Sequence, residues 1–295
     1  MSYDLYMRPR VGTVGREQFI AHFKSRAHYE RADNQSWYRN KDTGVYFVFE
    51  YSDTVTTNAP DLEDPASGHP LSFNINFCRP SFFGKEAEPE LSAFIERFDL
   101  LVDDPQIDGM GVGEYDSTKF LYGWSKGNEL GYQVLVQGEG ANTIFTAPSL
   151  QLERIWRWNY ERRRLQTQIG EGCFVPRIFF LEVEGKAKSA VVWPDAIPSL
   201  LPQVDYLFVD RQELAPRRFL RAIPDRALMP WHKAEPVIRD HSSVTETGAL
   251  LLSYSSPPSK IVKMVRNLPP ESQALRGIPD DAVLDAELVA KHQTK

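Results

Sequence analysis

Short runs in which apolar and polar residues alternate constrain the fold of this chain most strongly. Residues 3–7 and 71–77 each place an apolar side chain at every second position, which is the period of a half-buried β-strand. Two more strand patterns, residues 36–39 and 45–51, are joined by the Asn, Asp and Gly residues of 40–44, a composition that favours a hairpin turn. We therefore expect antiparallel sheet in the first half of the chain.

A second hairpin pattern lies in the later half. Residues 177–183 and 190–193 are mainly apolar or aromatic and flank the turn sequence Glu184-Gly185-Lys186. Residues 205–210 contain an apolar run between two aspartates and predict a further strand. Strands of this kind, with sparse helical patterns between them, indicate two lobes of mainly antiparallel sheet with a few covering helices, an α+β fold.

Apolar residues at helical spacing are found in several segments. Helices are predicted at 16–25, from Pro89 to Phe98, at 117–124, from Leu152 to Arg164, at 195–203 and at 281–290. Residues 131–137 alternate and predict a strand, whereas residues 52–69 have no apolar period and predict an exposed loop.

Length and charge indicate two domains. A chain of 295 residues exceeds the size at which one core usually stops growing. Residues 1–150 hold 22 acidic and 13 basic residues, a net charge of −9, whereas residues 151–295 hold 18 and 21, a net charge of +3. We predict an acidic α+β domain at 1–148 and a second α+β domain at 149–295, whose C-terminal part is rich in proline and partly irregular.

The excess negative charge is local. The stretch from Glu86 to Asp116 contains ten acidic residues and a single base, Arg97, so its net charge of −9 exceeds the −6 of the whole chain. Clustered charge of one sign bears on partners and on association rates. Because such a surface attracts basic groups, we expect a basic partner.

Eight carboxylates of this stretch are the candidate partner-binding residues. Some of them belong to the predicted helix, where acidic residues can also form a solvated helix face or complement the helix dipole. The others are expected in the loop beyond it, where that explanation does not apply. The candidates are Glu86, Glu88, Glu90, Asp103, Asp104, Asp108, Glu114 and Asp116.

No catalytic, cofactor-binding or metal-binding motif accompanies the acidic stretch. The six histidines form no HExxH motif, and the two cysteines, Cys78 and Cys173, are too few for a zinc cluster. The alternate glycines of residues 109–113 follow no strand pattern and precede no lysine, so they predict a flexible turn. We expect no catalytic residue, no cofactor and no metal.

The sequence gives no signal for membrane insertion. It has no N-terminal basic and apolar leader, and no apolar run approaches the roughly 20 residues that span a bilayer. Two isolated cysteines fit a reducing compartment, so we expect a cytoplasmic protein. The arginine-rich helix pattern that follows Leu152 could contact nucleic acid, but a pI near 5.6 disfavours that partner.

Several segments together resemble a family of bacterial immunity proteins. They are SYDLY at 2–6, the hairpin from WYRN at 37–40 to VYF at 45–47, FNIN at 73–76, and VDYLFVD at 204–210. The family is that of polymorphic-toxin and type VI secretion systems whose toxins are restriction-endonuclease-like nucleases, and the resemblance covers most of the chain. It implies a cytoplasmic, non-enzymatic protein that binds one cognate toxin and blocks its active site or its substrate groove.

The physical pattern agrees with this resemblance, since clustered carboxylates could occupy the cationic groove of a nuclease. Two alternatives remain open at this point. One is an enzyme whose site is assembled from residues distant in sequence, which would show a deep pocket with perturbed titratable groups. The other is an adaptor protein of a secretion apparatus.

Overall fold

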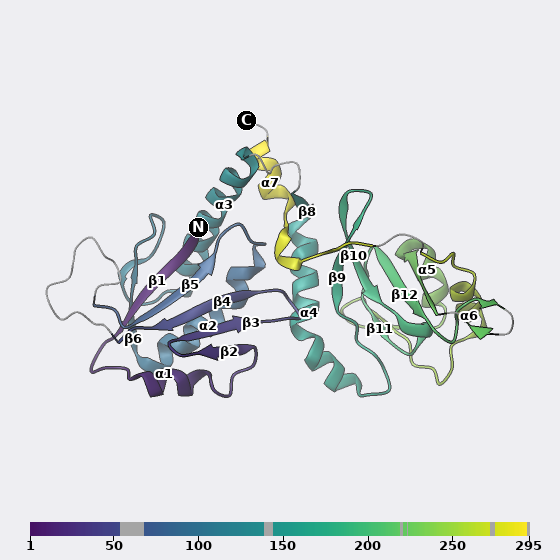
Figure 1. Ribbon diagram of the computed structural model, residues 1–295, viewed down its shortest axis with the longest axis horizontal. Coiled ribbons are helices and arrows are strands. Elements are labelled where there is room, and N and C mark those ends of the chain that lie inside the picture. Colours follow the sequence, from purple (N-terminus) through teal and green to yellow (C-terminus); the bar gives the residue numbers. More distant parts are fainter. Residues whose placement is uncertain (54–67, 139–143, 219–220, 223, 272–274, 294–295) are drawn as a thin grey trace. The chain divides into compact units, whose positions relative to one another are not determined.

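The computed structural model describes residues 1–53, 68–138, 144–218, 221–222, 224–271 and 275–293. They form two compact units (Figure 1). The first consists of Met1–Glu153 and Asp281–Lys295, and the second of Arg154–Asp280. The predicted α+β fold class is confirmed, because helices and mainly antiparallel sheets occur together in the described part of the chain.

The first unit contains a seven-stranded sheet with the order β2-β3-β4-β5-β1-β6-β7. The N-terminal strand β1 pairs antiparallel with the central strand β5 on one side and with β6 on the other (Figure 1). The strands are β1 (Ser2–Pro9), β2 (Tyr29–Ala32), β3 (Gln35–Arg39), β4 (Tyr46–Tyr51), β5 (Leu71–Asn76), β6 (Leu100–Asp104) and β7 (Gly111–Gly113).

One face of this sheet is apolar and covered by helices. Tyr3, Leu5 and Met7 alternate onto it and are fully buried, as the alternating pattern predicts. Phe49 and Phe73 lie opposite one another on the same face. The covering helices are α1 (Arg16–Phe23), α2 (Phe82–Phe98) and α3 (Ser117–Gln137).

Aromatic contacts hold these helices to the sheet. The ring of Phe94 on α2 lies 4.7 Å from that of Phe49, measured between centroids. Phe120 on α3 contacts both Tyr3 and Phe73, and Phe19 on α1 packs edge-on against Phe94. Because aromatic residues bury large areas and prefer such offset or edge-on geometries, they account for much of the core of the first unit.

Helix α2 begins seven residues earlier than the sequence predicts. Pro89 lies inside it rather than at its start, although proline removes one helical hydrogen bond. The upstream residues Phe82, Phe83 and Ala87 are buried, and this packing extends the helix beyond the predicted N-terminus.

A single helix, α3, replaces the predicted helix at 117–124 and strand at 131–137. Tyr132 and Val136 are four residues apart and buried on one side, whereas Val134 between them is 58% exposed. The helix contains glycines because it lies close to the end of β5. A Cβ at Gly127 would lie 2.2 Å from Phe77, and one at Gly131 would lie 2.9 Å from the Cys78 sulfur.

The C-terminal segment packs on the first unit, whereas the sequence prediction assigns it to the second domain. Strand β19 (Val283–Asp285) pairs parallel with β8 (Phe145–Ala147), and α7 (Ala286–Gln293) follows it. The buried carboxylate of Asp285 accepts hydrogen bonds from the Ser81 N–H at 2.8 Å, the Ser81 hydroxyl at 2.7 Å and the Tyr132 hydroxyl at 3.0 Å. The short 3₁₀ helix Asp280–Ala282 lies at the change from one unit to the other.

Helix α4 (Ser149–Ile169) carries the chain into the second unit, whose main sheet has the order β15-β12-β10-β9-β18. Strand β10 pairs parallel with β12, and the other neighbours are antiparallel. These strands are β9 (Ile178–Val183), β10 (Lys186–Val192), β12 (Tyr206–Arg211), β15 (Asp225–Pro230) and β18 (Gly277–Ile278).

Two further sheets of short strands belong to the second unit. The strands are β11 (Leu200–Leu201), β16 (Ser243–Val244) and β17 (Leu250–Leu251) in one sheet, and β13 (Arg217–Arg218) and β14 (Arg221–Ala222) in the other.

One prediction in the second unit needs correction. The helix expected at 195–203 is a short 3₁₀ helix, Pro194–Ala196, followed by β11. The proline-rich C-terminal part, predicted to be partly irregular, contains two short helices, α5 (Trp231–Arg239) and α6 (Ser259–Arg266). Helix α5 includes Pro236 but buries Trp231, Ala234 and Ile238 on one face, and this amphipathic burial holds the helix together.

Candidate functional site

Glu86 is a structural residue of the core, so its assignment to the partner-binding set is wrong. It is 1% exposed, and its Oε1 accepts hydrogen bonds from the Tyr38 hydroxyl at 2.8 Å, the Asn40 amide at 2.8 Å and the Thr43 hydroxyl at 3.0 Å. Asn40 and Thr43 belong to the hairpin turn between β3 and β4. The carboxylate therefore fastens that turn to α2.

Asp104 is also wrong as a contact residue. It is 3% exposed and lies in β6, not in the predicted loop. Its carboxylate accepts from the Tyr3 hydroxyl at 2.5 Å and from the backbone N–H groups of Gln106 and Met110. Burial, and then the hydrogen bond to Asp104, raise the pKa of Tyr3 well above its ordinary value. Asp104 thus shapes the turn between β6 and β7.

Glu90 is partly exposed and bound within the first unit. Its Oε2 lies 2.9 Å from a guanidinium nitrogen of Arg26 and 3.0 Å from the Tyr29 hydroxyl. Burial and the Glu90 charge raise the pKa of Tyr29, so its phenol keeps the proton that it donates. These contacts reduce the charge that Glu90 can present to a partner.

Asp103 and Asp108 are two further candidates, one within β6 and one in the turn that follows it. Asp103 also belongs to β6, and its carboxylate is 25% exposed and 3.9 Å from His69. It is on the polar face of the sheet, the opposite side from the core residues, beside Tyr6 of β1. Asp108 is exposed in the turn that follows β6.

Three of the candidates surround Tyr115. Asp116 is the N-cap of α3 and accepts from the backbone N–H groups of Thr118 and Lys119. Burial, then the Glu88 charge and the Asp116 charge, raise the pKa of Tyr115. Glu114 precedes this tyrosine and is 70% exposed.

Glu114 lines a surface recess between the end of α2 and the segment that joins β7 to α3. Its volume is about 250 Å³. Two further acids, Glu96 and Asp99, reach it from the last turn of α2 and from the C-cap. We call this site the acidic recess, and its lining residues are Ser92, Ile95, Glu96, Asp99, Leu100, Glu114 and Tyr115.

Arg10 partly neutralises the acidic recess. Its guanidinium lies 2.5 Å from Glu114 and 3.2 Å from Asp99. Both carboxylates raise the pKa of Arg10, so it stays charged. Three carboxylates against one guanidinium leave a net charge of about −2. The recess can therefore bind a positively charged side chain.

Sequence reasoning missed Glu96 and Asp99 as members of this site. Glu96 lies off the apolar stripe formed by Leu91, Phe94 and Ile95, which is the available signal that it faces solvent. Asp99 ends the helix in the left-handed conformation, with φ of 47°. Aspartate adopts this conformation more readily than most residues, but the sequence did not reveal where its side chain would point.

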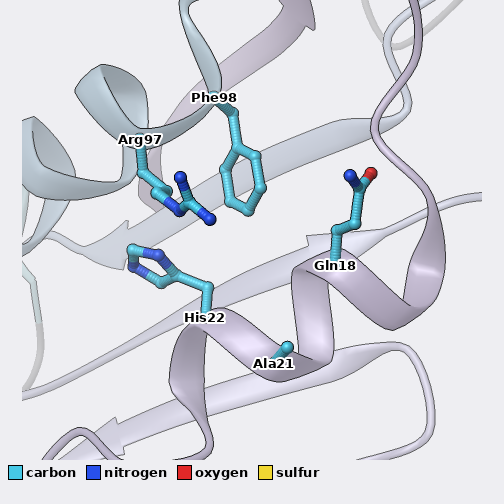
Figure 2. A pocket seen from close by; sticks show the side chains of 5 residues that line it. All are labelled: Gln18, Ala21, His22, Arg97 and Phe98. Carbon is cyan, nitrogen blue, oxygen red and sulfur yellow. The ribbon is translucent and has the colours of Figure 1, made fainter.

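A second pocket, of about 340 Å³, lies between α1 and the end of α2 (Figure 2). We call it the Arg97 pocket. In Figure 2 the guanidinium of Arg97 is drawn above the imidazole of His22, and the ring of Phe98 lies to one side of both. Its lining residues are Gln18, Ala21, His22, Arg97 and Phe98.

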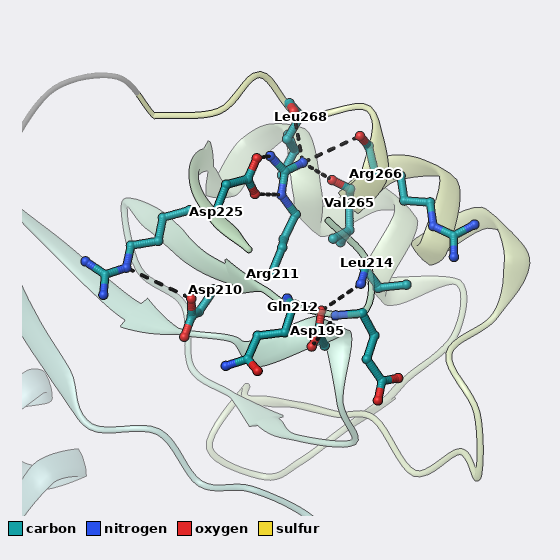
Figure 3. A network of polar contacts seen from close by, with 11 residues as sticks. Asp195, Asp210, Arg211, Gln212, Leu214, Asp225, Val265, Arg266 and Leu268 are labelled. Carbon is teal, nitrogen blue, oxygen red and sulfur yellow. Dashed lines mark hydrogen bonds and ion pairs between the residues drawn. The ribbon is translucent and has the colours of Figure 1, made fainter. Parts of the chain in front are cut away.

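In the second unit the main polar network is internal (Figure 3). The guanidinium of Arg211 is fully buried, binds both oxygens of Asp225 at 2.6 and 2.8 Å, and donates to the carbonyls of Val265 and Leu268. Nearby, the Asp195 carboxylate accepts from the N–H groups of three consecutive residues, 212–214. Both networks join distant loops to the sheet.

The described residues show few features of a metal site, a reactive thiol or a membrane-spanning helix. Within them, no three His, Cys, Asp or Glu side chains are placed to hold a metal ion. Cys173 is buried and Cys78 half-buried, and burial raises the pKa of both thiols, which disfavours the reactive thiolate. None of the helices in the described ranges has the length and apolar character of a membrane span.

Comparison of the chain with models of protein families, with curated proteins and with solved structures finds no match.

Proposed function

We propose that this protein is an immunity protein that binds and neutralises a cognate antibacterial toxin of a type VI secretion system. In this proposal the toxin is a nuclease with a cationic substrate groove. One observation carries the proposal: Glu96, Asp99 and Glu114 converge on a single recess that keeps a net negative charge beside Arg10.

The acidic recess suits an interaction with a basic side chain in both size and charge. A volume of about 250 Å³ can admit one lysine or arginine side chain from a partner. A partner guanidinium could form the bidentate pair that arginine makes with a carboxylate. Glu88 and Asp116, which act on Tyr115 at the edge of the recess, would extend the negative potential around it.

The proposed role needs no catalytic residue in this chain. The recess carboxylates would act as electrostatic ligands, and their potential would accelerate encounter with a cationic groove and orient the partner. Blocking that groove would exclude the nucleic-acid substrate of the toxin. This makes the cytoplasm, where a nuclease would act, the proposed location.

The test is protection of bacteria that co-express this protein with the product of the neighbouring reading frame. In the recess variant, Glu96→Lys is combined with Asp99→Asn, which tolerates the left-handed backbone at position 99. The matched control combines Glu171→Lys with Glu246→Gln, two exposed acids of the second unit, and makes the same change in net charge. Circular dichroism and thermal melting confirm that both variants fold.

We expect wild type and control to restore growth and to bind the toxin with the same affinity. The recess variant should bind at least 10-fold more weakly and with a smaller dependence on salt, because two carboxylates no longer contribute. Full protection by the folded recess variant would remove the acidic recess from the interface. Failure of the wild-type protein to bind the toxin would contradict the proposed function itself.

A further inference from the structure

The Arg97 pocket has features of a binding site for a small anion. Arg97 is the single base of the acidic stretch, yet it lines this pocket rather than the acidic recess, to which its neighbour Glu96 belongs. No carboxylate in the described part of the chain lies within ion-pair distance of Arg97. The guanidinium instead lies over the ring of Phe98, 5.9 Å from its centroid.

His22 contributes a second unsatisfied polar group. Its imidazole packs against the rings of Phe23, Phe94 and Phe98, and its Nε2 is buried without a hydrogen-bond partner among the described residues. Buried polar atoms are nearly always satisfied, so an orphaned one requires an explanation. Burial, then the positive charges of Arg26 and Arg97, lower the pKa of His22 to about 4.

Gln18 provides a further donor at the pocket wall. Its Oε1 accepts from the backbone N–H of Gly15 at 2.9 Å, which leaves the amide NH₂ to donate elsewhere. The remaining wall is apolar and consists of the Ala21 methyl group and the Phe98 ring (Figure 2). The pocket thus combines one uncommitted cation, neutral polar groups and an apolar surface.

We propose that the Arg97 pocket binds the carboxylate of a small organic acid, with the apolar body of the acid against Phe98 and Ala21. The guanidinium of Arg97 donates in a bidentate manner to the carboxylate, the geometry that this pair prefers. A pocket of about 340 Å³ is within the range of small-molecule sites.

The charge around the pocket favours a carboxylate over a phosphate group. Arg26, the second cation that acts on His22, is already bound to Glu90. Among the described residues of the pocket, one guanidinium without an ion pair matches one negative charge, and the imidazole of His22 is neutral at pH 7. A dianion would gain no second cation, and it would place its additional charge beside an apolar wall. This site is separate from the acidic recess and does not depend on the proposed immunity function.

The test follows the imidazole resonances of His22 by NMR in the full-length protein at pH 7 while benzoate is added. Inorganic phosphate at matched ionic strength is the second arm. Arg97→Gln removes the cation, and Ala21→Leu fills the pocket while leaving Arg97 in place. Arg31→Gln is the matched control, since Arg31 is exposed on β2 and takes no part in the pocket.

We expect saturable shifts of the His22 resonances with a Kd on the order of 1 mM for benzoate in the wild type and in Arg31→Gln. Both pocket variants should weaken this binding at least 10-fold while their circular dichroism spectra stay unchanged. The proposal would be overturned if benzoate caused no shifts or if the shifts did not saturate. It would also be overturned if folded Arg97→Gln bound benzoate as tightly as the wild type. Phosphate binding as tight as that of benzoate would overturn the choice of a carboxylate ligand.

Discussion

The two units of the protein bury charged groups in different ways. In the first unit, the carboxylates of Asp104 and Asp285 are buried and accept hydrogen bonds from hydroxyl and backbone N–H groups, and Glu86 accepts from hydroxyl and amide donors. In the second unit, the buried guanidinium of Arg211 is held by the opposite charge of Asp225 and by carbonyl oxygens.

The difference shows why a count of acidic residues overstates the negative surface of the first unit. A buried carboxylate whose oxygens are occupied by internal donors is not available to a partner. Glu86 and Asp104 belong to the densest acidic stretch of the sequence, but both are buried and stabilise turns of the sheet from within. Two acids of the acidic recess, Asp99 and Glu114, are also paired, with Arg10, but they stay exposed.

Breaking the Arg211–Asp225 ion pair of the second unit should lower the stability of the protein more than any other change proposed here. Arg211→Met leaves Asp225 and several carbonyls without their donor, and we expect the free energy of unfolding to fall by about 3–5 kcal/mol. Combining it with Asp225→Leu should recover much of this loss, because no charge is then left unpaired. Urea denaturation with hydrogen exchange, read separately for peptides of each unit, measures the effect. A double variant as unstable as the single one would contradict the pairing argument.

Substitutions at Glu86 test whether hydrogen bonds from neutral donors stabilise the first unit as strongly as the Arg211–Asp225 ion pair stabilises the second. Glu86→Ala leaves three buried donors without this acceptor, and we expect a loss of about 3 kcal/mol. Glu86→Gln keeps one oxygen at the site and should lose about 1 kcal/mol. Faster exchange should be concentrated at residues 40–45, in the hairpin turn. Equal stability of the Ala and Gln variants would contradict the role of the shared oxygen.

A smaller, pH-dependent effect on stability is expected at His22. The pKa of His22 is lowered to about 4 from an ordinary value of 6.5. The unfolded chain therefore binds a proton before the folded protein does, so this contribution to stability is present above pH 6.5 and is lost toward pH 4. Partial exposure of His22 limits the loss to about 1–2 kcal/mol.

The measurement compares wild type with His22→Gln by urea denaturation between pH 7 and pH 4. Subtracting the two curves removes the titration of carboxylates that both proteins share. We expect the advantage of the wild type to shrink as the pH falls. A constant difference between the two proteins over this range would show that His22 titrates as an ordinary histidine.

The sequence predicts those parts of the fold that depend on local patterns. Alternation predicts β1 and β5, and the turn residues 40–44 predict the β3–β4 hairpin. The start of α2 and the length of α3 depend instead on packing against residues far along the chain. Gly131 opens the strand that alternation predicts at 131–137, yet both Gly127 and Gly131 lie inside α3, where Phe77 and Cys78 leave no room for a larger side chain.

The same distinction applies to the candidate sites. Charge density pointed to Glu114, which does line the acidic recess. It could not separate this acid from Glu86, whose burial depends on Tyr38, Asn40 and Thr43 more than forty residues earlier. No pattern in the sequence predicts the Arg97 pocket, because α1 and the end of α2 come together only in the folded protein.

The return of the chain to its first unit through Asp285 has a consequence for protein synthesis. Residues 154–280 leave the ribosome before the strand that pairs with β8 and before the carboxylate that binds Ser81 and Tyr132. The second unit is thus an insertion that can complete its folding while the first unit still lacks its closing segment. A newly made chain holds the Ser81 end of α2 in its final state only after Asp285 has left the ribosome.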